Sequence, residues 1–178
     1  MLTVTVTPQP PLAEWEAALT AGERQIRTAA VRALNKTARW MRTHVAREAA
    51  QSLNVRVGLI RNGLILLRAR ASHPESGVAL GKAAGVIKAA ELGTPRQNRR
   101  GTRVAKRQFD GAFIATMPTG HRGVFRRKGK SRLPIQEVQL VATGRIADVM
   151  EQLADRHAMA RFERLFEHEL RYLMRTTA

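Results

Sequence analysis

The stretch VRALNKTARWMRTHVAREAA, residues 31–50, contains neither glycine nor proline and places its small and apolar side chains at helical intervals. The same spacing of three and four positions continues on both sides of it, which is the repeat of one helical face. This pattern predicts a helical region from about residue 12 to residue 52, which Gly22 divides into a short helix and a long one. The apolar face comprises Ile26, Ala30, Ala33, Leu34, Thr37, Met41, Val45 and Ala49, and the other faces carry Arg24, Arg27, Arg32, Arg39, Arg42 and Arg47.

A second apolar stripe of helical spacing occupies the C-terminal region, and it predicts a helix over residues 145–178. His157 falls on this stripe, so we interpret it as a packed core histidine and not as a catalytic base. The stripe consists of Ile146, Val149, Met150, Leu153, His157, Ala160, Phe162, Leu165, Phe166, Leu170 and Leu173.

The remaining sequence predicts short strands separated by turn residues. Residues 2–6 alternate Leu-Thr-Val-Thr-Val, and the prolines of PQPP end this strand because proline cannot continue a ladder. A short helix is expected within SLNVRVGLIRNG, residues 52–63. Further strands are predicted in LILLRARA (64–71), GVIKAAELG (85–93), FDGAFIATM (109–117) and GVFRR (123–127), the last two joined by a turn at 118–120.

Composition bounds the kinds of protein that this chain can be. Its 178 residues suffice for one domain, residues 1–178, and the formal net charge of +17 implies an acidic partner. The chain has no cysteine, which excludes disulfides and thiolate chemistry. No apolar run approaches the roughly 20 residues of a membrane helix. We therefore expect a soluble chain with no membrane partner and no export signal.

Most of the excess charge lies between residues 94 and 132, where twelve basic residues face the single acid Asp110. The part TPRQNRRGTR has turn residues and little hydrophobicity, which predicts a mobile basic loop over residues 94–107 that orders only against an acidic surface. The twelve candidates for anion or subunit contact are Arg96, Arg99, Arg100, Arg103, Lys106, Arg107, Arg122, Arg126, Arg127, Lys128, Lys130 and Arg132.

Motifs that resemble catalytic sites do not meet the requirements of those sites. Gly129-Lys130-Ser131 looks like a phosphate-binding loop, but the glycine that must precede it stands at Gly123, one residue too early, and a strand follows where a helix is required. The sequence HELRY at residue 168 has Tyr172 where a zinc protease has its second histidine. We predict no enzyme, no metal, no cofactor and no small-molecule substrate.

The sequence leaves two acidic partners open. Clustered Lys and Arg could neutralise phosphates, yet sequence-specific nucleic-acid modules also show a reading helix or exposed stacking aromatics. Phe109, Phe113 and Phe125 alternate with small residues, as buried strand positions do. Direct nucleic-acid contact and contact with acidic proteins alone are therefore equally supported by the residues.

The order of these features resembles the minor tail protein Z family of tailed bacteriophages and prophages, also called tail completion proteins. The likeness extends from Val31 to Leu173, with a shorter region between Gly63 and Val86 than in long members. It depends most on the hairpin and return strand in FDGAFIATMPTGHRGVFRRKGKSRLPIQEV, residues 109–138. The residues that carry it are Phe113, Gly120, His121, Gly123, Val124, Phe125, Leu133, Pro134 and Ile135.

The resemblance implies a virion structural protein without catalytic activity, placed at the head-proximal end of the tail. Its implied partners are the tail terminator, the tail tube and the head–tail connector, with a homo-oligomeric ring and possible nonspecific contact with the DNA end. A free-standing, sequence-nonspecific nucleic-acid-binding protein is the alternative.

For the fold we predict an α+β domain, in which a small antiparallel sheet of about four strands packs against two long helices and a basic loop and hairpin project from it. The expected divisions are an N-terminal strand or arm (1–11), a helical region (12–52), a mainly β region (53–144) and the C-terminal helix (145–178).

Overall fold

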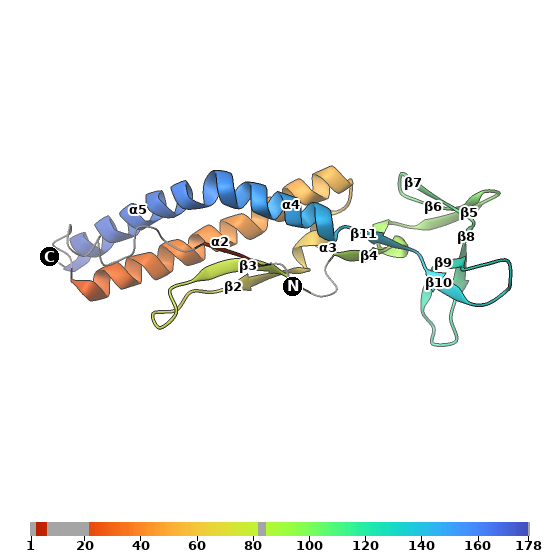
Figure 1. Ribbon diagram of the computed structural model, residues 1–178, viewed down its shortest axis with the longest axis horizontal. Coiled ribbons are helices and arrows are strands. Elements are labelled where there is room, and N and C mark those ends of the chain that lie inside the picture. Colours follow the sequence, from red (N-terminus) through yellow and green to blue (C-terminus); the bar gives the residue numbers. More distant parts are fainter. Residues whose placement is uncertain (1–2, 7–21, 82–84, 178) are drawn as a thin grey trace.

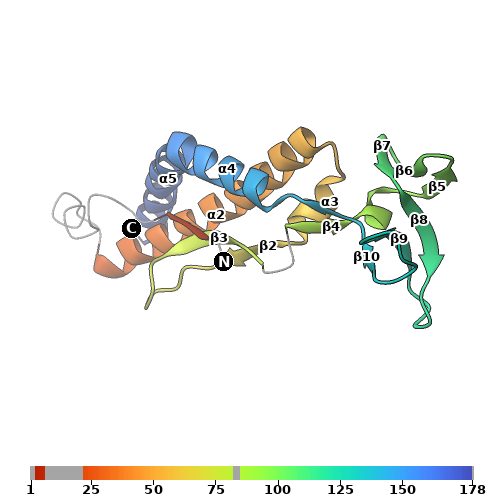
Figure 2. The same cartoon turned by 45° about the vertical axis from the view of Figure 1, so that its right-hand side comes forward.

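The chain is elongated, with its long helices and one small sheet at one end and the other small sheets at the opposite end (Figures 1 and 2). The structure, a computed structural model, describes residues 3–6, 22–81 and 85–177. We call residues 86–141 the β lobe, and the other described residues the helical lobe. A two-stranded ribbon connects the two lobes (Figure 2).

Helix α2, Glu23–Leu53, forms the long axis of the helical lobe. Its buried face follows the predicted stripe, with Ile26, Leu34 and Val45 fully inaccessible to solvent. Asn54 caps the C-terminus of the helix: its left-handed backbone (φ 48°) turns the chain so that the N–H of Val55 donates to the carbonyl of Ala50 at 3.0 Å. Residues 12–21 of the predicted helical region lie outside the described residues.

The C-terminal helical region has a break that the sequence stripe did not predict. It comprises α4 (Thr143–Leu153), the π-helical turn η2 (Ala154–Ala158) and α5 (Met159–Thr177). The π turn accommodates one extra residue, so the buried face passes from Leu153 to Ala158. His157 is exposed as a result, and its interpretation as a packed core histidine is wrong.

A three-stranded antiparallel sheet lies along α2 in the helical lobe (Figure 1). Its order is β1 (Thr3–Val6), β3 (Ser76–Leu80) and β2 (Leu64–Leu67). The buried Ser76 hydroxyl donates to the carbonyl of Leu34 at 2.8 Å, which ties the sheet to the helix. The short helix α3, Val57–Arg61, precedes β2, and the predicted strand 64–71 already ends at residue 67.

The ribbon between the lobes pairs β4 (Val86–Lys88) with β11 (Gln139–Val141). Beyond it the N–H of Ala142 donates to the carbonyl of Gly85 at 2.6 Å, so the chain enters and leaves the β lobe at one place. The predicted strand 85–93 stops at residue 88, because Ala89–Leu92 form the 3₁₀ turn η1.

The structure corrects the prediction of a loop over residues 94–107, because the chain forms strands there. β5 (Pro95–Asn98), β6 (Gly101–Val104) and β7 (Arg107–Asp110) form an antiparallel meander. Polar side chains stabilise it in place of an apolar stripe: the Asn98 side-chain oxygen accepts the N–H groups of residues 100 and 101 at 3.0 and 2.9 Å. The hydroxyl of Thr102 donates to the carbonyl of Ala112 at 3.0 Å.

A second meander completes the β lobe. β8 (Ala112–Thr116), β9 (Arg122–Arg127) and β10 (Ile135–Glu137) pair antiparallel in that order. The predicted strand 109–117 is divided at Gly111, which has a φ of 68° and separates β7 from β8. Residues 128–131, which resemble a phosphate-binding loop in sequence, lie in the turn between β9 and β10.

The prediction of an α+β fold with small antiparallel sheets is confirmed. The single sheet of about four strands is not found, because the described strands divide into four sheets of two or three strands. Within the described residues, no helix has both the length and the apolar character that crossing a membrane requires.

Candidate functional site

The β lobe carries most of the net charge of the protein at one end of the molecule (Figure 1). Residues 86–141 contain 13 Lys and Arg residues and 3 acidic residues, a net charge of +10 out of +17. All twelve candidate cations predicted from the sequence lie in this lobe, where Arg107 is half-buried and the other eleven are exposed. The lobe is therefore the candidate contact surface.

Few of these cations are neutralised within the chain. Among the described residues, the ion pair of Arg100 with Asp110, at 2.9 Å, is the one that involves any of the twelve candidates. Arg107 donates to the carbonyl of Leu53 at 2.5 Å and so connects β7 to the C-terminal end of α2. Arg127 lies over the ring of Phe113, 5.8 Å from its centroid.

Two arginines stand directly opposite each other on the first meander. Arg96 of β5 is the register partner of Arg103 of β6, and Gln108 of β7 is next in the row. Both arginines are exposed, and like charges in this arrangement destabilise a sheet. The row therefore presents positive charge that the fold itself does not compensate.

Arg56 joins this surface although the sequence analysis did not single it out. It precedes α3, and three adjoining hollows of about 380, 430 and 480 Å³ all include it in their lining. We call the cations of these hollows the concave basic face. They are Arg56, Arg96, Arg103, Lys106, Arg107 and Arg122.

No local signal could have identified Arg56. It lies outside the basic segment 94–132, and it reaches the face because α3 packs near the ribbon that enters the β lobe (Figure 2). By contrast, Lys128, Lys130 and Arg132 belong to the basic segment but line none of these three hollows.

The hairpin residues that carry the family resemblance lie together on the second meander. Phe113 and Phe125 are register partners with ring centroids 6.4 Å apart, and His121 meets Phe125 edge to face at 6.2 Å. A Cβ at Gly123 would lie 2.9 Å from the carboxylate of Glu137 and would displace the end of that side chain. The others are buried Val124, Gly120 in the turn (φ 81°), exposed Leu133 and Pro134, and Ile135 opposite Arg127.

Glu137 connects this cluster to the ribbon. Its carboxylate lies 2.7 Å from the His121 ring nitrogen and 3.1 Å from the Lys88 ammonium. Burial raises the pKa of Glu137, but the hydrogen bonds and charges of His121 and Lys88 outweigh burial and lower the pKa below its ordinary value. The carboxylate is therefore charged at neutral pH and positions the hairpin over the ribbon.

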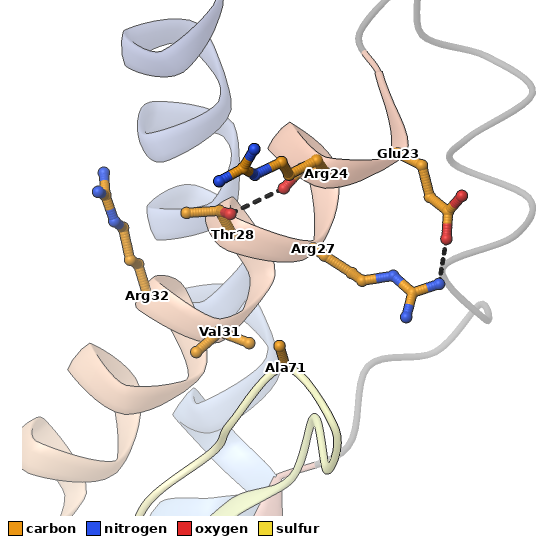
Figure 3. Close-up of a pocket in the computed structure, with 7 residues that line it drawn as sticks. All are labelled: Glu23, Arg24, Arg27, Thr28, Val31, Arg32 and Ala71. Atoms are coloured by element: carbon orange, nitrogen blue, oxygen red, sulfur yellow. Dashed lines mark hydrogen bonds and ion pairs between the residues drawn. The ribbon is translucent and has the colours of Figure 1, made fainter.

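Another hollow, of about 670 Å³, lies at the other end of the molecule, where α2 begins (Figure 3). Arg24, Arg27 and Arg32 line it, together with Ala71 from the turn between β2 and β3. Arg27 pairs with Glu23, and Arg32 with the buried Glu169 at 3.5 Å, so two of its three cations are neutralised. It has less uncompensated charge than the concave basic face.

Exposed charge spread over strands and hollows is the arrangement of a surface that binds another macromolecule. In the described part of the chain, no three His, Asp or Glu side chains are grouped so that they could hold a metal ion. Residues 19–178 match the family described as prophage minor tail protein Z (GPZ). The chain belongs to this family of phage tail structural proteins, as the hairpin sequence indicated. Neither a curated protein nor a solved structure gives a match.

Proposed function

We propose that this tail protein is a tail completion protein, which assembles at the head-proximal end of the tail and helps to join the tail to the head. The observation that carries the proposal is the concentration of uncompensated charge in one lobe of an elongated molecule. A subunit of this kind has two chemically different ends, and an end-of-tail component must contact different structures above and below it.

The same two-ended shape supports a homo-oligomeric ring. Head-to-tail contacts between copies require two different surfaces on each subunit, and rings form when the rotation between copies closes. The helical lobe and the β lobe supply such a pair of surfaces. The expected neighbours are the tail tube, the tail terminator and the head–tail connector, in the tail and neck of the virion and, during assembly, in the host cytoplasm.

A direct test is electron microscopy of the purified protein mixed with tails that lack it. We expect density at the head-proximal end alone, and particles that then join heads. Density along the whole tube or at the distal end would contradict the proposal. The free-standing nucleic-acid-binding alternative predicts no density on tails at all.

Charge reversal tests whether the β lobe is the contact surface. Arg126 and Arg127 end β9 and are exposed, so Arg126→Glu with Arg127→Glu should leave the melting temperature nearly unchanged and abolish joining. Arg39→Glu with Arg47→Glu, at exposed positions of α2, changes the charge by the same amount and serves as the control. Equal loss of joining in both variants would mean that total charge matters and its location does not.

A further inference from the structure

The concave basic face has little counter-charge among the described residues. Glu91 is the one acidic residue that lines any of its three hollows. The Glu91 carboxylate accepts the backbone N–H of Lys88 at 2.8 Å and thereby caps the turn η1. Glu91 lines the hollow of Arg56 and Arg122, whereas the hollow of Arg96 and Arg103 has no acidic residue in its described lining.

The composition of the face favours a polyanion over an acidic protein. Protein interfaces have an apolar centre that is depleted of charged residues. None of the exposed large hydrophobic residues of the described chain lines these hollows. Interfaces with nucleic acid are instead strongly positive. Among the described residues, six cations and a single acid, Glu91, line the hollows of this face.

The position of the aromatic residues favours a duplex over a single strand. Proteins that bind single strands stack the bases on exposed aromatic rings. Here Phe109 is half-buried, Phe125 is buried, and neither lines a hollow of the face. A duplex needs no such platform, because its phosphates face outward and its bases remain stacked.

We propose that the concave basic face binds the phosphate backbone of double-stranded DNA without sequence preference. Arginines from separate elements, Arg56 before α3, Arg96 and Arg103 on the first meander and Arg122 on β9, lie around adjoining hollows and can contact successive phosphates. Phosphate contacts fix position and carry no base information. The proposal rests on the proposed function, because a protein that joins the tail to the head is adjacent to the DNA that the head contains.

Two variants with equal charge test the assignment. Arg56→Gln, Arg96→Gln and Arg103→Gln remove three cations of the concave basic face. The matched control, Lys128→Gln, Lys130→Gln and Arg132→Gln, removes three exposed cations that line none of its hollows. The affinity of the full-length protein for a short mixed-sequence duplex is measured by fluorescence anisotropy over a range of salt concentrations.

Each phosphate contact contributes about 0.9 to the slope of log affinity against log salt concentration. We expect the first variant to lower the magnitude of this slope by about 2.7 and to weaken binding at low salt about tenfold or more. The control should change the slope by less than about 1. Circular dichroism confirms folding, and if the triple variant is unfolded, Arg96→Gln alone should lower the slope by about 0.9.

Several results would overturn the proposal: equal slopes for the two variants, no duplex binding by the unaltered protein at low salt, or competition by poly-glutamate as effective as that of the duplex. If single-stranded DNA competes more effectively than the duplex, the choice of a duplex as the ligand is wrong. Tail localisation by microscopy is scored separately on the same proteins. Duplex binding without localisation would reject the proposed function alone, whereas localisation without duplex binding would reject this inference alone.

Discussion

Gly101 begins β6 in a backbone conformation that disfavours a side chain. Its φ is 149°, and a Cβ there would lie 2.2 Å from the carbonyl oxygen of Phe109 on β7. Neither group can move without disturbing the pairing of β6 with β7. A side chain at this position would therefore disturb the first meander.

Gly101→Ala should therefore destabilise the β lobe. Unfavourable backbone conformations cost about 1 to 3 kcal/mol, and the steric overlap adds to that cost. Amide hydrogen exchange should become faster in β6 and β7, and the free energy of unfolding in urea should fall. Gly129→Ala is the control, because nothing lies within 4 Å of its Cβ position, and it should change the stability by less than about 0.5 kcal/mol. Equal behaviour of the two variants would contradict this account.

Glu169 is the buried acid of the helical lobe, and its charge state should couple the stability of that lobe to pH. The carboxylate on α5 contacts Lys36 and Arg32 of α2. Burial raises the pKa of Glu169, but the hydrogen bond from Lys36 and the charges of Lys36 and Arg32 outweigh burial and lower the pKa below 4.5. The pKa of Glu169 is lower in the folded state than in the unfolded state. The stabilisation of the folded state by the Glu169 ion pairs is therefore complete above about pH 4.5 and is lost as pH falls through the folded pKa.

Glu169→Gln should cost about 1 to 3 kcal/mol at pH 7, because two cations lose their buried acceptor. The difference in unfolding free energy from the unaltered protein should shrink as urea titrations are repeated from pH 5 towards pH 3. Glu167→Gln, at an exposed position 3.8 Å from Arg171, should have almost no effect at any of these pH values. A difference that stays constant with pH would exclude the ion pair as the cause.

At the scale of elements, the π turn η2 sets the register between α4 and α5. The buried residues of α5 recur every four positions, at Phe162, Phe166 and Leu170, whereas the step from Leu153 to Ala158 is five. Removing one exposed residue inside the turn, Asp155, makes that step four and allows a regular α-helix. Deletion of Asp155 should therefore change the unfolding free energy by less than about 1 kcal/mol.

Deletion of Arg164 is the contrasting variant. It removes one residue between Phe162 and Phe166, so every later side chain of α5 rotates by about 100° about the helix axis. Phe166 and Leu170 would leave the core, at a cost of about 3 kcal/mol or more. Urea unfolding of both deletion variants checks the prediction, and similar losses would show that the π turn has another role.

How much of the fold the sequence predicts depends on what stabilises each element. The face of α2 was readable because apolar spacing determines it, and so was the β8–β9 hairpin, whose turn contains Pro118 and Gly120. The first meander was missed because amide and hydroxyl groups of Asn98 and Thr102 stabilise it, and such residues also occur in loops. The five-residue step before Ala158 was visible in the sequence, but the continuous stripe through His157 concealed it.

The candidate site was predictable in composition and not in shape. The charge count identified the basic segment, and the hairpin sequence at residues 109–138 identified the family. The grouping of Arg56 with Arg96, Arg103 and Arg122 depends on how α3 lies against the β lobe, which is a tertiary property. Local sequence patterns carry no information about such a grouping.

At the scale of the whole molecule, the chain passes between the lobes at one place, so the β lobe can be removed with the loss of the Arg107–Leu53 hydrogen bond. Gly85 and Ala142 already share a hydrogen bond of 2.6 Å, and the helical lobe has buried residues in α2, β3, α4 and α5. Replacing residues 86–141 by a short glycine-serine linker should leave a chain of net charge +7 that melts cooperatively and retains its helical circular dichroism. Helical signal with a gradual, non-cooperative melt would show that the helical lobe needs the β lobe in order to fold.

The placement of +10 of the net charge at one end of an elongated chain gives the molecule a large permanent electric dipole moment. A dipole turns in the field of an acidic target before contact is made, and this raises the fraction of collisions that begin in a productive orientation. The protein should thus approach such a target with the β lobe first, and salt should slow its capture more than it speeds its release.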